Sequence, residues 1–191
     1  MRPVFIVLEG IDGTGKTTAA AAVKGYLESK GHKVTVTAEP THGAIGELVA
    51  RTDDLSPEAE ALLFTADRAC HTDEIRKLIS EGVSVISDRY YVSTLAYQSA
   101  AGMDEDWLRA LNSKITMEPD LTVVLDMDPE LSLRRVDSRG EKSRFEKLDY
   151  QKKVRAAYLR IADEKGYPVV DASGSREEVA GMIIREMERR L

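Results

Sequence analysis

Five short apolar runs rich in β-branched residues recur along the chain, and longer segments with helical spacing separate them. The runs are Val4–Glu9, Lys33–Glu39, Val83–Asp88, Leu121–Asp128 and Tyr167–Ala172. Strands that are apolar on both faces and alternate with helices are typical of a parallel sheet covered on both sides. The pattern therefore predicts an α/β fold. Because 191 residues suit one well-buried domain and no linker or repeat interrupts them, we expect a single domain over residues 1–191.

The segments between these runs predict helices. In "TTAAAAVKGYLESKG" the apolar residues Ala20, Val23 and Leu27 share one face, and Gly31 suits the end of the helix. The segment from Ser56 to Gly82 opens with a Ser-Pro-Glu start signal, but its length predicts a break or a second helix. Residues 134–150 are densely charged and include Gly140, so we predict a helix–turn–helix flap outside the body.

Composition narrows the classes of function. The formal net charge of -6, from 27 basic and 33 acidic residues, argues against a nucleic-acid binder but leaves room for a small anionic ligand. A single cysteine allows no internal disulfide and suits a reducing, cytoplasmic location. No apolar run is long enough to span a membrane, and Arg2 with the few apolar residues before Glu9 leads us to expect no signal peptide.

The strongest motif directly follows the first apolar run. Gly10-x-x-x-x-Gly15-Lys16-Thr17 fits the phosphate-binding loop pattern, in the strand–loop–helix context that the pattern requires. Glycines let backbone N–H groups turn toward a phosphate, Lys16 suits the β- and γ-phosphates, and the Thr17 hydroxyl suits Mg²⁺. The alternatives are a plain glycine turn and a dinucleotide site, and the G-x-G-x-x-G spacing of the latter is absent. We expect these loop residues to bind ATP: Gly10, Ile11, Asp12, Gly13, Thr14, Gly15, Lys16, Thr17 and Thr18.

Other features distinguish a kinase from a guanine-nucleotide switch. The Asn-Lys-x-Asp signal of such a switch has no match in "LNSKIT". Asp88 ends a predicted buried strand, where a P-loop protein keeps the acidic partner of its Mg²⁺, and Arg89 beside it suits a second phosphate. Three of the arginines in the flap could neutralise a transferred phosphoryl group, namely Arg135, Arg139 and Arg144. Asp88 and Arg89 could alternatively form a surface salt bridge, and the charged flap could be a solvated face. Together with the phosphate loop, however, these features favour a kinase.

Several segments in this order resemble the thymidylate kinase family. They are "FIVLEGIDGTGKTT", "LLFTADR", "SDRYYVSTLAYQ", "PDLTVVLDMDPELSLRR" and "SRGEKSRFE", and they cover almost the whole chain. The resemblance implies transfer of phosphate from MgATP to dTMP. It also implies an adenylate-kinase-like, three-layer P-loop kinase fold with a five-stranded parallel sheet, a helical lid over about 134–150, and usually a homodimer.

The resemblance also implies roles for individual residues. Phe64 resembles the aromatic residue that stacks on the thymine ring, and Arg68, one helical turn later, the arginine that hydrogen-bonds its exocyclic oxygen. Asp12 resembles a carboxylate near the sugar 3′-hydroxyl and the metal site. Core packing is the alternative for Phe64. The residues expected to bind the acceptor are Glu39, Pro40, Phe64, Arg68, Arg89, Thr94, Tyr97 and Gln98. Those expected to take part in catalysis are Asp12, Lys16, Arg89, Arg139 and Arg144, with Arg135 on the ATP side and Thr17 and Asp88 at the metal.

The family has two arrangements of a catalytic arginine, one in the phosphate loop and one in the lid. Position 13 is glycine here, so the chain resembles the type with its arginines in the lid. One departure from the family pattern bears on the acceptor. An arginine often stands beside the Glu-Pro element, but here the neighbours are Ala38, Thr41 and His42. His42 could compensate or be a surface histidine. The alternatives that stay open are a related kinase with another acceptor, such as dUMP or a deoxynucleoside, and a non-transferring nucleotide-binding switch.

Overall fold

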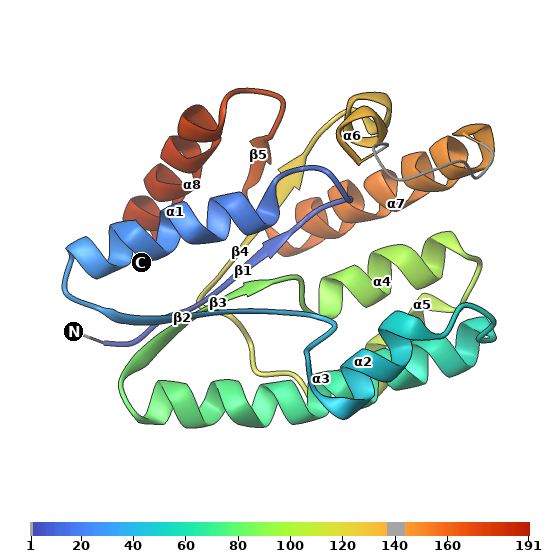
Figure 1. The fold of residues 1–191 in the computed structure, drawn as a ribbon, viewed down its shortest axis with the longest axis horizontal. Helices are drawn as coiled ribbons and strands as arrows, with labels where there is room; N and C mark the ends of the chain where they lie inside the picture. Colours follow the sequence, from blue (N-terminus) through green and yellow to red (C-terminus); the bar gives the residue numbers. More distant parts are fainter. Residues whose placement is uncertain (1, 137–143) are drawn as a thin grey trace.

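The computed structural model describes residues 2–136 and 144–191, and at its centre lies a sheet of five parallel strands (Figure 1). The strands are β1 (Phe5–Glu9), β2 (Lys33–Ala38), β3 (Val83–Asp88), β4 (Leu121–Asp126) and β5 (Val169–Asp171). Their spatial order is β2-β3-β1-β4-β5. Because β1 lies beside β3, with Leu8 paired to Asp88, the loops that follow these strands meet at one edge of the sheet.

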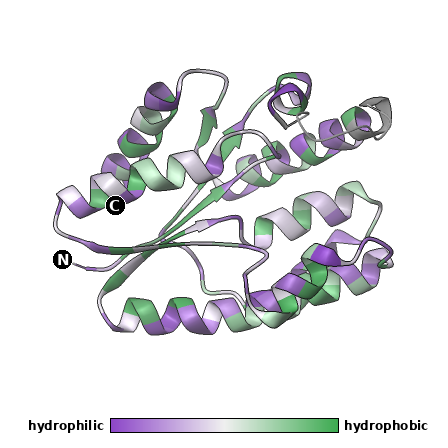
Figure 2. Ribbon diagram, viewed as in Figure 1, coloured by the Kyte–Doolittle hydropathy of each residue, from purple (hydrophilic) through white to green (hydrophobic). Residues whose placement is uncertain are grey.

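Helices cover both faces of the sheet, as the alternation of apolar runs and helical segments predicts. They are α1 (Lys16–Ser29), α2 (Ala44–Arg51), α3 (Pro57–Ser80), α4 (Tyr91–Ala100), α5 (Glu105–Asn112), α6 (Pro129–Val136), α7 (Arg144–Lys165) and α8 (Arg176–Arg190). On one face, Val23 of α1 and Ile183 of α8 belong to the same buried cluster as Ile6 and Leu8 of β1. The opposite face packs against α3, α4, α5 and α7. The predicted three-layer α/β fold is therefore confirmed, and Figure 2 shows hydrophobic colour on β4 and β5.

The predicted strands are confirmed, with boundaries that shift by up to two residues. β2 differs in burial, because it lies at an edge of the sheet and its side chains are only partly covered. The predicted break between Ser56 and Gly82 is wrong, since α3 is one continuous helix of 24 residues. Ser56 caps its start by accepting a hydrogen bond from the Ala59 N–H, and no glycine or proline follows Pro57 before Gly82.

The predicted flap lies partly outside the described residues. Its start falls in α6 and its end in α7, while residues 137–143, including Arg139, are not described. α7 continues to Lys165 and contributes Val154, Tyr158 and Ile161 to the core. In the part of the chain that the structure describes, no helix has the length and apolar character to cross a membrane.

Candidate active site

The phosphate loop connects β1 to α1 and can be built only with glycines at its turning points. Gly10, Gly13 and Gly15 all have positive φ angles, which L side chains rarely adopt. At Gly10 a Cβ atom would lie 2.4 Å from the Leu125 carbonyl oxygen, so a side chain has no room there. Gly15 precedes α1 and carries no capping side chain, so the first N–H groups of the helix remain for a ligand.

Lys16 lies folded into this loop. Its ammonium group donates hydrogen bonds to the carbonyl oxygens of Gly10 at 3.0 Å and Ile11 at 2.9 Å. Burial lowers the pKa of Lys16 to about 8, and the neighbouring Arg89 adds to this shift, while Asp88 and Asp12 oppose it. The loop therefore holds its lysine at the position where a phosphate chain would reach it.

A cavity of about 740 Å³ opens along the loop. The predicted residues that line it are Asp12, Gly13, Thr14, Gly15, Lys16, Thr17, Thr18, Asp88, Arg89 and Arg135. Gly10 and Ile11 are not among its lining residues, since the Ile11 side chain packs in the core. Ser175 and Arg176, at the start of α8, line the far side and had no signal in the sequence. We refer to this space as the donor cavity.

The two residues expected at the metal lie together on the floor of this cavity. The Thr17 hydroxyl donates a hydrogen bond of 2.7 Å to a carboxylate oxygen of Asp88. Among the described residues, no group of three or more His, Cys, Asp or Glu side chains could hold a metal by itself. Mg²⁺ with a nucleotide needs only one or two protein oxygens, because phosphates and water complete its shell. The hydroxyl–carboxylate pair therefore fits Mg²⁺.

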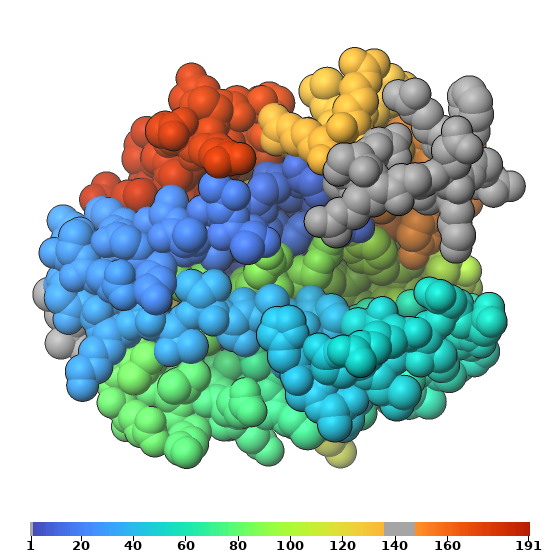
Figure 3. All heavy atoms as spheres, viewed as in Figure 1, coloured from blue at the N-terminus to red at the C-terminus, as the bar shows by residue number. Residues whose placement is uncertain are grey.

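A second cavity, of about 320 Å³, adjoins the first, and we refer to it as the acceptor cavity. All the residues predicted to bind the acceptor line it: Glu39, Pro40, Phe64, Arg68, Arg89, Thr94, Tyr97 and Gln98. Glu60, Ser93 and Tyr150 line it too. Phe64 is half-exposed and lies outside the buried clusters, so its surroundings fit the stacking role better than the core alternative. The space-filling view shows a hollow above α2 and the start of α3, with α4 at its floor (Figure 3).

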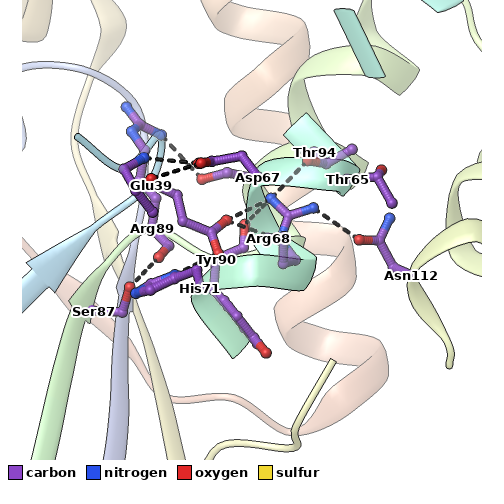
Figure 4. A network of polar contacts seen from close by, with 12 residues as sticks. Glu39, Thr65, Asp67, Arg68, His71, Ser87, Arg89, Tyr90, Thr94 and Asn112 are labelled. Atoms are coloured by element: carbon purple, nitrogen blue, oxygen red, sulfur yellow. Dashed lines mark hydrogen bonds and ion pairs between the residues drawn. The ribbon is translucent and has the colours of Figure 1, made fainter. Parts of the chain in front are cut away.

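Arg68 is buried in the wall of the acceptor cavity (Figure 4). Its guanidinium donates to Glu39 at 2.8 Å, to the Asn112 side-chain oxygen at 2.8 Å and to the Thr94 hydroxyl at 3.0 Å. Glu39 also contacts His71 Nδ1 at 2.8 Å. Asn112 and His71 could not be predicted from the sequence, because contacts across 44 and 32 positions leave no local pattern. Arg68 therefore has a buried structural role as well as its place beside the cavity.

Arg89 lies between the two cavities and lines both, as does Asp12. Its backbone φ of 75° lies in the left-handed region, which is uncommon for a residue other than glycine. One guanidinium nitrogen, Nη2, donates to Asp12 at 2.5 Å and to the Tyr97 hydroxyl at 3.3 Å. The other, Nη1, donates to the Gly10 carbonyl at 3.2 Å. Arg89 is therefore placed to contact phosphates on either side.

The most buried charged group near this site is Glu9, which the sequence-based prediction did not include. Glu9 ends β1 immediately before Gly10 and is wholly buried. Burial raises its pKa to about 7, although hydrogen bonds from Ser93 and Tyr90 and the charge of Arg89 act in the opposite direction. Its place at the end of a strand next to the phosphate loop was the one available signal.

The remaining predicted residues have less defined places. His42 is exposed, contacts Glu47 at 3.3 Å and does not line the acceptor cavity, so the surface-histidine alternative fits. Arg135 donates to the carbonyl oxygens of Ala172 and Ser173 at 3.2 Å each, beside the donor cavity. Arg139 lies outside the described residues, and the structure describes only the backbone of Arg144.

Comparison with known proteins shows which family this chain matches. A family model described as thymidylate kinase matches residues 8–183. A probable thymidylate kinase of Archaeoglobus fulgidus is 46% identical, over 97% of this chain and 95% of that protein. Probable thymidylate kinases of Pyrobaculum aerophilum and Pyrococcus horikoshii are 42% and 43% identical, over 97% and 100% of this chain and 96% and 98% of theirs.

Proposed function

Because the chain belongs to the thymidylate kinase family of nucleoside monophosphate phosphotransferases, we propose that it transfers the γ-phosphoryl group of MgATP to dTMP. The products would be dTDP and ADP. The observation that carries this proposal is the pair of adjoining cavities that share Arg89 and Asp12. A phosphate loop alone would bind only the donor nucleotide. The second cavity, on the other side of Arg89, could hold the phosphate acceptor.

On the donor side, the chain supplies positioning and charge. The backbone N–H groups at the start of α1 and the Lys16 ammonium would hold the β- and γ-phosphates. Thr17 and Asp88 would hold Mg²⁺, which supplies charge neutralisation on the transferred group when it is bound with ATP. No general base is needed, because the acceptor phosphate is already anionic.

On the acceptor side, Arg89 would bind the phosphate of dTMP through Nη2, exchanging its contact with Asp12 for the phosphate. Phe64 would stack on the base, and Thr94 and Gln98 line the same cavity. Tyr97 would lie beside the sugar, where its ring leaves little space for a 2′-hydroxyl. The two phosphates would then meet in line across Arg89.

The lid is part of the proposal as well. Residues 134–150 would close over the bound nucleotides, and Arg139 and Arg144 would place positive charge on the transferred phosphoryl group. Gly13 leaves the loop itself without such an arginine.

We also propose that the protein is a cytoplasmic homodimer. Exposed apolar side chains lie on β2, α2 and α3, namely Val36, Leu48 and Leu62. Light scattering on the purified protein tests the dimer, and Leu62→Glu should shift it toward the monomer. A monomeric wild-type protein would contradict this part of the proposal without affecting the proposed reaction.

An ADP-release assay with MgATP tests the reaction. The acceptors are dTMP, dUMP, CMP, AMP and thymidine, each at the same concentration. We expect dTMP to give the highest turnover. Equal rates with dTMP and CMP would exclude a thymidylate kinase, and ADP release without any acceptor would indicate a nucleotide-binding switch.

A further inference from the structure

Glu9 is a buried carboxylate that the reaction outlined above does not use, and it binds the segment that carries Arg89. Its Oε1 accepts hydrogen bonds from the backbone N–H groups of Tyr90, at 2.9 Å, and Ser93, at 3.2 Å. Tyr90 is the N-cap residue of α4, so Glu9 satisfies donors of the first turn of a helix on another element. This contact fixes the turn between β3 and α4, in which Arg89 has its left-handed backbone.

The second carboxylate oxygen of Glu9 binds two hydroxyl groups that also contact Arg89. Oε2 accepts from the Ser93 hydroxyl at 2.6 Å and from the Tyr158 hydroxyl at 3.2 Å, and the two hydroxyl oxygens also lie 2.7 Å from each other. Arg89 Nη1 donates to the same two oxygens, at 3.1 Å and 3.2 Å. A hydroxyl has one proton to donate. Because the carboxylate of Glu9 can only accept, the Ser93 proton turns toward Glu9, and the Tyr158 proton turns toward Glu9 or the Ser93 oxygen. Lone pairs of both hydroxyls are then left facing Arg89.

This arrangement gives the guanidinium one side that is anchored in the interior and one side that faces the cavities. Nη1 is held by Ser93, Tyr158 and the Gly10 carbonyl, whereas Nη2 points toward Asp12 and Tyr97 at the acceptor cavity. We propose that Glu9 is a positioning residue, which acts through Ser93 and Tyr158 to hold Arg89 in the orientation that binds the acceptor phosphate. The inference rests on the proposed function, since it assigns Arg89 to that phosphate.

Replacing Glu9 with a neutral side chain of the same shape should change the direction of these hydrogen bonds. In Glu9→Gln the amide NH₂ can donate to Ser93 or Tyr158, and the hydroxyl protons are then free to turn toward Arg89 Nη1. Two donors would then face each other. We expect the KM for dTMP to rise about tenfold or more, as after loss of charge-assisted hydrogen bonds, while the KM for ATP stays within about twofold. Direct calorimetric titration with dTMP should show the same loss.

Stability separates this role from a purely structural one. Because burial of the Glu9 charge costs free energy, the melting temperature of Glu9→Gln should rise relative to that of the wild type between pH 5 and pH 8. A variant that keeps its melting temperature yet loses dTMP affinity supports positioning. Equal losses in both KM values, or unchanged binding of dTMP by a folded variant, would overturn the inference. A wild-type protein inert toward dTMP would instead overturn the proposed function.

The pH profile gives another readout. The groups that face Glu9 are Arg89, Tyr158, Lys16, Glu39 and Tyr91. Because the pKa of Glu9 is raised to about 7, wild-type affinity for dTMP should increase as the pH rises through 7. Glu9→Gln should lose that part of the profile and keep the part due to the phosphate of dTMP itself, which also titrates near pH 6.

Tyr158→Phe tests the contact that runs from Glu9 through the Tyr158 hydroxyl to Arg89, and it leaves the carboxylate in place. It removes one hydroxyl between Glu9 and Arg89, so we expect a smaller rise in the KM for dTMP in the same direction. Tyr167→Phe is the matched control, because the Tyr167 hydroxyl contacts the Tyr91 hydroxyl at 2.9 Å and the Glu118 carboxylate at 3.5 Å, and among the described residues it makes no hydrogen bond with Glu9 or Arg89. Equal effects of both substitutions on dTMP binding would contradict the role of Tyr158 between Glu9 and Arg89.

Discussion

At the scale of single residues, two arginines beside the acceptor cavity have different surroundings and therefore different roles. Arg68 is wholly buried, and its donors are occupied by Glu39, Asn112 and Thr94. Arg89 keeps Nη2 at the junction of both cavities. The sequence could predict that both line the acceptor side, because each belongs to a recognisable segment. It could not predict the burial of Arg68, since its partners are dispersed along the chain.

We expect Arg68→Ala to destabilise the fold as well as weaken acceptor binding. Removal of the guanidinium leaves the buried carboxylate of Glu39 without its main partner, a loss that typically costs about 3–5 kcal/mol. Chemical denaturation measures this change. Arg76→Ala, on the same helix, is the control, because its contact with Asp73 is exposed and should contribute less than about 1 kcal/mol. Similar stability of the two variants would contradict a structural role for Arg68.

Phe64 should behave in the opposite way. Because its side chain is half-exposed and lines the acceptor cavity, Phe64→Ala should raise the KM for dTMP about tenfold through lost stacking. The melting temperature should change little. Thermal denaturation together with kinetics checks both parts, and global unfolding of the variant would support core packing instead.

At the scale of elements, local signals predicted where strands and helices lie but not how far each extends. The positions of the strands followed from β-branched runs, to within two residues at each end, and Ser56-Pro57 marked the start of α3. The predicted break in α3 failed because length is a weak argument when no glycine or proline interrupts the helix. Arg144 begins α7, a helix whose later turns carry Val154 and Tyr158 in the core. Arg144, which we propose acts in the lid, is therefore the first residue of a helix that is anchored in the body.

This anchoring leads to a prediction for the lid. If Arg144 acts on the transferred phosphoryl group, Arg144→Ala should lower kcat far more than it raises the KM for ATP. Steady-state kinetics with saturating dTMP measures both constants. Arg160→Ala, further along α7 and paired with Glu164, is the control and should leave both constants unchanged. A loss confined to ATP affinity would place Arg144 in binding rather than in the transition state.

At the scale of the whole molecule, the strand order decides which residues meet. Alternation of strands and helices predicts a parallel sheet, but it does not say that β1 lies between β3 and β4. That order brings Glu9 against Ser93 and Tyr158, which are 84 and 149 positions away in the chain. For this reason the phosphate loop was predictable from a short motif, whereas the charged group behind Arg89 was not.

The buried charge of Glu9 should appear in the stability of the molecule as a function of pH. Its pKa is raised from 4.5 to about 7 in the folded protein, so the folded state binds more protons than the unfolded state between these values. Stability from this group is therefore full below about pH 4.5 and is lost as the pH rises through 7, by about 3 kcal/mol in total.

Denaturation of the wild type and of Glu9→Gln between pH 5 and 8 measures this loss. Partly exposed carboxylates such as Glu105 and Glu186 have lowered pKa values and stabilise the fold in the opposite direction, as the pH rises from acid. Because these groups are present in both proteins, their effect cancels in the difference between the two free energies of unfolding. That difference should move in favour of Glu9→Gln as the pH increases, and a constant difference would show that Glu9 keeps the same charge throughout this range.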